Sequence, residues 1–204
     1  MANNQLVRTV GVAAFLLNSC LNGSLAATAP QAAAAADAPV TLLRNAQVEV
    51  VRHAGARCDA SAKAIRVIVT RAGAVRSLAP GEPTPCGSGD VEIILRQQPT
   101  GHAPSSPLNP WRVDPNHYQI VLDNAAVRVI RVRMGPRERA PLHEHSLDRV
   151  VIYMTDQDFR ITPEQKDPER VTHRAGDVGW GIPLRHVEEN LANRSFEAIV
   201  VELK

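Results

Sequence analysis

The hydrophobic and polar positions of this chain alternate in short runs, and these runs are separated by Gly, Pro, Asp and Asn. Such alternation is typical of half-buried β-strands, because successive side chains of a strand point to opposite faces. No segment beyond the first 36 residues shows a sustained helical period. The pattern predicts an all-β sandwich or jelly-roll barrel. We expect strands at 46–52, 64–70, 91–96, 118–123, 127–134, 149–155, 159–162, 171–173, 177–180, 186–191 and 196–202.

One expected strand changes the parity of its apolar positions. Val127 and Val129 share one face, whereas Ile130, Val132 and Met134 share the other. Barrels often bend a strand with a bulge at such a point. We therefore expect a bulge or a switch of face near Val129.

A proline-rich stretch at 98–110 divides the chain. Proline has no backbone N–H, so the stretch is not expected to form a helix or a sheet ladder. The sequence predicts a small β-rich subdomain at 40–97, this linker, and a second domain at 111–204. The subdomain has no aromatic residue. A unit that is small and poor in large side chains needs a disulfide or a neighbouring domain for stability.

The first 36 residues have the layout of a secretory signal peptide, with an apolar run at 10–17 followed by small residues and an alanine-rich segment. Arg8 is the only charged residue of this segment. The apolar run is too short to span a bilayer, so no stable membrane span is expected. We expect a periplasmic or secreted protein. The alternative is a membrane-anchored lipoprotein, because the residues up to Cys20 are similar to a weak lipoprotein signal.

If Cys20 is removed with the signal peptide, Cys58 and Cys86 remain as an even pair. In an oxidising compartment such a pair usually forms a disulfide, and two unpaired thiols are the alternative. The loop-entropy model assigns a loop of this size about 3 to 4 kcal/mol of stabilisation. No Cys-x-x-Cys spacing indicates a zinc or thioredoxin-like site.

Composition and net charge narrow the range of partners that the protein is expected to bind. The chain has 204 residues, of which 44% are hydrophobic and 22% charged, as in an ordinary globular protein. Its formal net charge is only +2, and basic residues are interleaved with acidic ones. This distribution excludes the basic patch that a nucleic-acid-binding protein presents. We expect the partner to be a small-molecule ligand or substrate.

Two histidine-bearing motifs lie in the second domain, at 135–145 and 176–190. The first ends in a His-x-His pair, His143 and His145. On a strand, residues two apart share a face, so both imidazoles are expected on the same side. His186, from the second motif, would complete a three-histidine metal site.

These motifs resemble those of the cupin superfamily, small antiparallel β-barrels whose interior commonly holds one transition metal. The strand pattern extends the resemblance from about residue 114 to the C-terminus. Cupins usually place a Glu a few residues beyond the His-x-His pair, whereas here Arg149 and Val150 stand at the matching positions and Asp148 lies one residue short. The fourth protein ligand is therefore open. The resemblance is carried by Gly135, His143, His145, Gly176, Pro183, His186 and Asn190.

The resemblance implies a cupin-type jelly-roll barrel that binds one divalent metal through His143, His145 and His186. Three neutral imidazoles leave coordination positions for water or substrate, but they do not distinguish Fe, Mn, Zn and Ni. Glu188 shares parity with His186, and is either a fourth ligand, an acceptor that orients an imidazole, or a surface carboxylate. Arg149 either binds an anionic substrate or points outward.

The remaining histidines have no motif partner. His53 is expected at the surface or half-buried, and His102 in the linker is expected to face solvent. We expect His117 and His173 to be structural or exposed. Glu144 lies between the paired histidines and should face the opposite side of its strand.

Three-histidine cupin sites without the Glu resemble those of thiol dioxygenases, in which ferrous iron activates oxygen. The pattern with Glu is shared by quercetin-type dioxygenases, isomerases and other classes, so the fold alone does not select a reaction. We expect a metal-dependent oxygenase or isomerase that acts on a small molecule. The alternatives are a non-catalytic module for ligand or metal sensing or storage, and a metal-free structural cupin. The resemblance also implies a possible homodimer.

Overall fold

The computed structural model describes residues 38–55, 58 and 63–204, and almost all of its regular structure is β-strand. The expected signal peptide and Cys20 lie outside the described residues. The all-β prediction is confirmed. Across the described residues, no helix has the length and apolar character needed to cross a membrane.

The first sheet has five antiparallel strands in the order β1-β2-β5-β3-β4. One face carries short aliphatic side chains from alternate positions of its three inner strands, such as Val48, Val67 and Ile93. The opposite face carries Ile68 and Leu78 beside the two cysteines. The strands are β1 (Val40–Arg44), β2 (Val48–Arg52), β3 (Arg66–Val69), β4 (Val75–Leu78) and β5 (Val91–Leu95).

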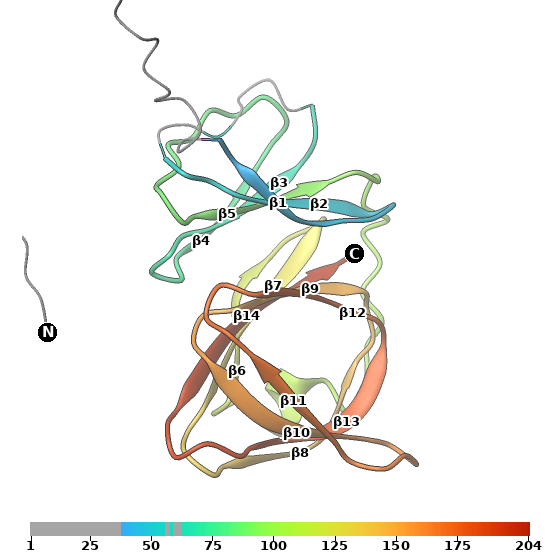
Figure 1. Cartoon of the computed structure of the whole chain (residues 1–204). Helices are drawn as coiled ribbons and strands as arrows, with labels where there is room; N and C mark the ends of the chain where they lie inside the picture. Colours follow the sequence, from blue (N-terminus) through green and yellow to red (C-terminus); the bar gives the residue numbers. More distant parts are fainter. Residues whose placement is uncertain (1–37, 56–57, 59–62) are drawn as a thin grey trace, which may run out of the picture. The chain divides into compact units, whose positions relative to one another are not determined.

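Two further antiparallel sheets form the barrel, in the orders β11-β10-β13-β8 and β12-β9-β14-β7-β6. Figure 1 shows their strands arranged as a ring. Strands far apart in sequence are neighbours, as in a jelly roll, with β8 beside β13 and β7 beside β14. The strands are β6 (Tyr118–Asp123), β7 (Val127–Met134), β8 (Arg139–His145), β9 (Arg149–Tyr153), β10 (Gln157–Pro163), β11 (Glu169–His173), β12 (Val178–Gly181), β13 (Leu184–Asn190) and β14 (Phe196–Leu203).

The five-stranded barrel sheet is buried on both faces. Its outer face, including Val129 and Ile199, shares one apolar cluster with the first sheet. Its inner face, including Ile130 and Val200, belongs to a second cluster inside the barrel. Burial on both faces gives strands with apolar residues at both parities. This double burial explains the unusual patterns of β7 and β14.

The bulge or switch of face expected near Val129 is confirmed only in part, because β7 itself has no bulge in its pairing with β14. The pairing of β7 with β14 is continuous from Val127 to Met134. The change of apolar parity arises because Val127 and Val129 face the first sheet while the later apolar residues face the barrel interior. Beside Val129 the irregularity lies in the neighbouring strand β6, where the register shifts between Ile120, which pairs with Ile130, and Leu122, which pairs with Val129.

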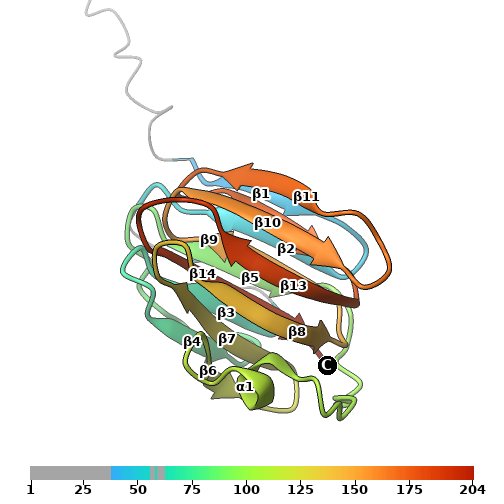
Figure 2. The same ribbon diagram turned by 90° about the horizontal axis from the view of Figure 1, so that it is seen from below.

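One short helix, α1 (Pro110–Val113), begins at the last residue of the predicted linker and lies mostly in the second domain. Proline is tolerated at the first turn of a helix, because the N–H that it lacks has no intrahelical partner there. Pro110 occupies this position. The helix lies against β6 and β8 at the edge of the barrel (Figure 2).

The predicted disulfide is present. Cys58 and Cys86 are bonded, with their Cα atoms 5.4 Å apart, and both side chains are buried. The bond connects the loop after β2 to the loop before β5. It lies on the face of the first sheet that contains Ile68 and Leu78.

We expect a Cys58→Ala, Cys86→Ala variant to lose about 2–5 kcal/mol of its free energy of unfolding, because the open chain gains conformational freedom in the unfolded state. Urea denaturation of the wild type and the variant measures the difference. A thiol reductant should destabilise the wild type and leave the variant unchanged. Equal stability of the oxidised wild type and the variant would show that this bond does not stabilise the fold.

Candidate metal centre

Three buried histidines meet inside the barrel. His143 and His145 lie on β8, and His186 lies on the neighbouring β13 directly opposite His143. The ring centroids are 4.4 Å apart for His143 and His186, 5.4 Å for His143 and His145, and 5.8 Å for His145 and His186. One nitrogen from each ring lies within 4.8 Å of the other two. The structure therefore brings together the three residues that the two motifs predicted as ligands.

Strand periodicity aims these rings inward. His143 and His145 are two residues apart, so they share a face, and Glu144 between them faces the other side. There Glu144 accepts a hydrogen bond from Ser106 Oγ at 2.5 Å and pairs with Arg185. This placement agrees with the sequence prediction, which put Glu144 outside the site.

The ends of the two motifs are connected to each other. Asn190 is fully buried, and its side-chain nitrogen donates hydrogen bonds to the carbonyl oxygens of Gly135 and Arg194, at 2.7 and 2.8 Å. The first residue of one motif is thus bonded to the last residue of the other. This contact helps to hold β8 and β13 in the register that opposes His143 and His186.

The hydrogen bonds of the rings leave nitrogen lone pairs for an ion. His143 Nδ1 lies 2.9 Å from the carbonyl oxygen of Pro141, and His145 Nδ1 lies 2.9 Å from Glu202 Oε1. When Nδ1 carries the proton, Nε2 is free to act as a ligand. His143 Nε2 and His186 Nδ1 are buried and have no hydrogen-bond partner among the described residues. Buried polar atoms without partners are rare, and a bound metal would satisfy them. The donor set fits a divalent transition metal.

Burial also keeps these imidazoles neutral. It lowers the pKa of His186 to about 3, lowers that of His143, and places that of His145 well below its usual value. The positive charge of Arg149 nearby acts in the same direction on all three. Only a neutral imidazole binds a metal. The barrel therefore holds the three rings in their ligand form.

Glu202 is a site residue that the sequence analysis missed. It lies on β14, is 2% exposed, and accepts the hydrogen bond from His145 Nδ1. Burial raises its pKa to about 7. A carboxylate that orients a ligand imidazole commonly accompanies metal sites. The sequence contained one indication, because Glu202 interrupts the apolar run that ends the chain.

Glu188 lies on the same strand as His186 and lines the same cavity, but it is not part of the three-histidine group. Its Oε2 accepts a hydrogen bond from the hydroxyl of Tyr118 at 3.0 Å. Among the described residues, Glu188 makes no hydrogen bond to an imidazole of the three-histidine group. The carboxylate that accepts a hydrogen bond from His145 is Glu202. Tyr118 also packs on the His143 ring, with centroids 4.8 Å apart.

A cavity of about 290 Å³ extends from the histidines through the barrel. His145, His186 and Arg149 line it together, so Arg149 lies inside the barrel and does not point outward. The walls are mainly aromatic and aliphatic. The apolar residues that line the walls include Trp180, Phe159, Phe196, Ile161, Val151 and Val200.

A second group of potential ligands lies on the first sheet. His53 is 7% exposed, so the expectation of a surface or half-buried residue is wrong. Its Nε2 lies 2.9 Å from Glu92 Oε2 and 3.5 Å from Cys58 Sγ. Sequence reasoning failed because Glu92 lies on β5, 39 residues from His53 along the chain. The two sulfurs of this group are bonded to each other, so they are not thiolate ligands in this structure.

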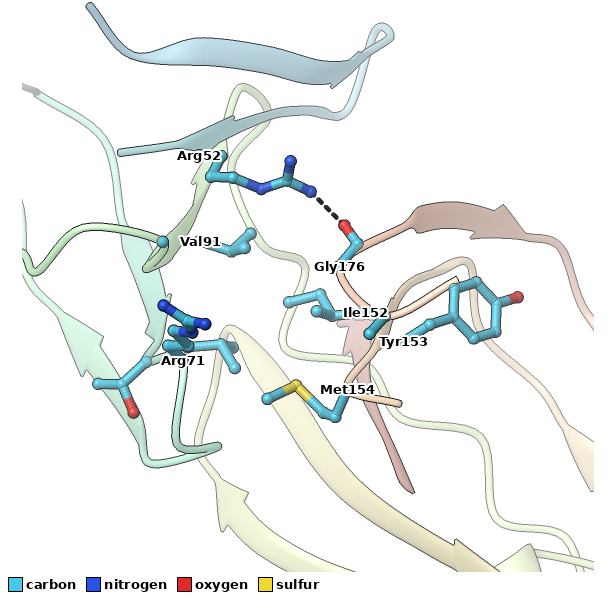
Figure 3. A pocket seen from close by; sticks show the side chains of 11 residues that line it. Arg52, Arg71, Val91, Ile152, Tyr153, Met154 and Gly176 are labelled. Carbon is cyan, nitrogen blue, oxygen red and sulfur yellow. Dashed lines mark hydrogen bonds between the residues drawn. The ribbon is translucent and has the colours of Figure 1, made fainter. Parts of the chain in front are cut away.

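A larger hollow of about 390 Å³ lies away from the three histidines (Figure 3). In it the Arg52 guanidinium donates a hydrogen bond to the carbonyl oxygen of Gly176, and the Tyr153 ring points away. Arg71 and Met154 also line it. Neither group of potential metal ligands in the described part of the chain belongs to this hollow. Two of the three clustered histidines, His145 and His186, line the smaller cavity instead.

The other histidines lie outside the site. His102 is exposed, and His173 stacks on Tyr153 with ring centroids 3.7 Å apart. His117 Nδ1 lies 2.6 Å from Asp114, and its Nε2 lies 2.8 Å from Glu138. Burial alone would lower the pKa of His117, but the two carboxylates outweigh burial and raise it above 6.5.

We expect a His117→Gln variant to be less stable than the wild type at pH 6, and this difference to shrink at pH 9. The pKa of His117 is higher in the folded state, so the folded state binds the proton of this imidazole more tightly than the unfolded state does. The contribution of His117 to the free energy of unfolding is therefore complete at pH values below the pKa of the unfolded state. It is lost as pH rises through the higher pKa of the folded state. The effect should be small, because Glu138 is exposed and screened by solvent. Urea denaturation at both pH values tests this, and an equal difference at both would contradict it.

Comparison with known proteins gives neighbours by structure only. No family model matches the chain, and a search of curated proteins also finds no match. A cupin domain from Bordetella pertussis Tohama I is 26% identical, with 43% of this chain and 91% of that chain covered and a TM-score of 0.40. A Cupin 2 conserved barrel domain protein from Salinispora arenicola is 24% identical, with 50% and 87% covered and a TM-score of 0.37.

A sugar phosphate isomerase from a cupin superfamily, from Silicibacter pomeroyi, is 17% identical. The match covers 47% of this chain and 65% of that chain, with a TM-score of 0.33. The barrel of two antiparallel sheets and the inward-facing histidines are observed in this chain itself. Cupin-domain proteins are among these structural neighbours, and cupins are the superfamily that the two histidine motifs resemble.

Proposed function

We propose that the protein binds one divalent transition metal through His143, His145 and His186 and acts on a small molecule in the barrel cavity. The observation that carries the proposal is the pair of buried nitrogens without partners, His143 Nε2 and His186 Nδ1, on converging neutral rings. A polar group buried without a hydrogen bond is costly, so a native protein rarely keeps two of them together without a ligand.

The reaction class that we propose is oxygenation or isomerisation. A bound metal with open positions supplies Lewis acidity or, if it is redox-active, activation of oxygen. The chain's own residues hold the metal ligands in position and shield the bound molecule from water. Glu202 orients the His145 ring, and the aromatic walls keep bulk water from the reacting molecule. Tyr118 and Glu188 form a hydrogen-bonded pair on the cavity wall, where a proton could be held close to a bound substrate.

We further propose that the protein is exported. The Cys58–Cys86 disulfide supports this, because disulfides persist in oxidising compartments. Cell fractionation of the native protein, followed by sequencing of its N-terminus, tests the proposal. A mature N-terminus downstream of residue 20 in a soluble extracytoplasmic fraction is expected. A lipid-modified Cys20 would instead establish the membrane-anchored form, and a cytoplasmic chain that retains Met1 would contradict export.

The proposed function is tested by metal analysis and by turnover. Protein purified from its native compartment should contain close to one equivalent of a transition metal, as measured by plasma mass spectrometry. Oxygen uptake and product analysis with a panel of small carboxylates and sugars should then identify turnover. Metal without turnover would favour a sensing or storage module. Absence of metal, together with failure to bind added Fe²⁺, Mn²⁺, Ni²⁺ or Zn²⁺, would leave a structural barrel.

A further inference from the structure

Arg149 is a buried cation in the cavity wall. It lies on β9, and its side chain is 7% exposed. It lines the same cavity as His145 and His186. In the cupin resemblance, Arg149 is one of the two positions at which the usual Glu would stand. A guanidinium remains protonated even when it is buried, so the cavity contains a fixed positive charge.

The fold leaves a specific space for this side chain. Gly181 on β12 is the cross-strand partner of Arg149. A Cβ at Gly181 would lie 2.8 Å from both Nε and Cζ of Arg149, so only glycine leaves the guanidinium in its present place. Nη1 donates a hydrogen bond to the carbonyl oxygen of Ile182 at 2.5 Å. The guanidinium is thus held beside β12.

Within the described part of the chain, Arg149 forms no ion pair, and its one hydrogen bond is to that carbonyl oxygen. The nearby carboxylates are engaged by other groups. Glu202 accepts the hydrogen bond from His145, and Glu188 accepts the one from Tyr118. A buried cation without a paired anion is unfavourable. An anionic ligand in the cavity would supply the missing partner.

We propose that Arg149 is the carboxylate-binding group of the cavity, and that the natural ligand is a small, mainly apolar molecule with one carboxylate. A guanidinium matches a carboxylate with two parallel hydrogen bonds. Arg149 is the one Lys or Arg among the lining residues, so a singly charged anion fits better than a phosphate. The aromatic and aliphatic walls would contact the rest of the molecule, and about 290 Å³ limits it to a small size. This inference rests on the proposed function, because it names the substrate class of the same cavity.

The test compares benzoate with benzamide, which has a similar shape but no charge. Binding to the full chain, stripped of metal with a chelator, is measured by isothermal titration calorimetry. Benzoate should bind about tenfold more tightly than benzamide or better, because the hydrogen bonds to it are charge-assisted. Arg149→Gln should abolish this preference. The control Arg160→Gln, which removes an exposed arginine on β10, should keep it.

Gly181→Ala provides an independent variant if Arg149→Gln fails to fold. It keeps the charge but displaces the guanidinium, so the preference for benzoate should fall. The inference is overturned if benzoate and benzamide bind the wild type equally, if a folded Arg149→Gln protein still prefers benzoate, or if inorganic phosphate displaces benzoate at equal concentration. Metal content is measured separately. A chain that prefers benzoate but binds no metal would retain this inference and lose the proposed function.

Discussion

Replacing His143 and His145 with alanine is expected to reduce bound metal from about one ion per chain to none. The double variant removes two of three ligands, and His186 alone offers one nitrogen. Loss of a group that only orients a ligand already weakens metal binding about 10–100-fold, so loss of two ligands should exceed that range. Plasma mass spectrometry of wild type and variant, purified side by side, measures the content.

His102→Ala is the matched control, because it removes an exposed imidazole far from the cluster in sequence. It should retain the metal content of the wild type. Circular dichroism and thermal unfolding establish that the double variant is folded, which matters because both removed side chains are buried. Equal metal content in the wild type and a folded double variant would exclude this site and, with it, the proposed chemistry.

Glu202→Gln is expected to weaken metal binding about 10–100-fold while leaving the three ligands in place. The carboxylate holds His145 Nδ1 at 2.9 Å and so keeps Nε2 directed toward the cluster. Glutamine has nearly the same shape but lacks the negative charge, so it orients the ring less firmly and makes the imidazole a weaker donor. Competition against a chromogenic chelator gives the dissociation constant.

Glu197→Gln is the control for this variant, since Glu197 lies on the same strand but pairs with Arg131 and Arg133 outside the cluster. It should bind metal as the wild type does. A Glu202→Gln protein with unchanged affinity would show that the hydrogen bond to His145 stabilises the fold without affecting the metal. Measuring thermal stability of both variants without metal separates the two effects.

The strand pattern and the histidine motifs could be predicted because both depend on local periodicity. Strand alternation placed His143 and His145 on one face and Glu144 on the other, as observed. The same reasoning was only partly right at β7. A change of apolar parity indicates either a bulge or burial on both faces, and a single strand cannot distinguish these. The first sheet covers the outer face of β7, so β7 itself needs no bulge, and the register shift beside Val129 lies in β6.

The partners of buried charges could not be predicted, because they come from strands distant in sequence. Glu202 meets His145 across 57 residues, and His53 meets Glu92 across 39. From the sequence, it stayed open whether the side chain of Arg149 points outward or binds an anionic substrate. Its burial inside the barrel depends on the pairing of β9 with β12, which puts a glycine opposite it.

By itself, the sequence determined that the chain is β-rich, and it predicted that Cys58 and Cys86 pair and that three histidines from two motifs share one barrel. These conclusions follow from side-chain alternation, the cysteine count and motif spacing, all of which can be read along the chain. Only the tertiary structure decided which nitrogens lack partners, that Glu202 orients His145, and that Arg149 faces the cavity. Those outcomes depend on strand order and on the burial of charge, which are properties of the packed sheets.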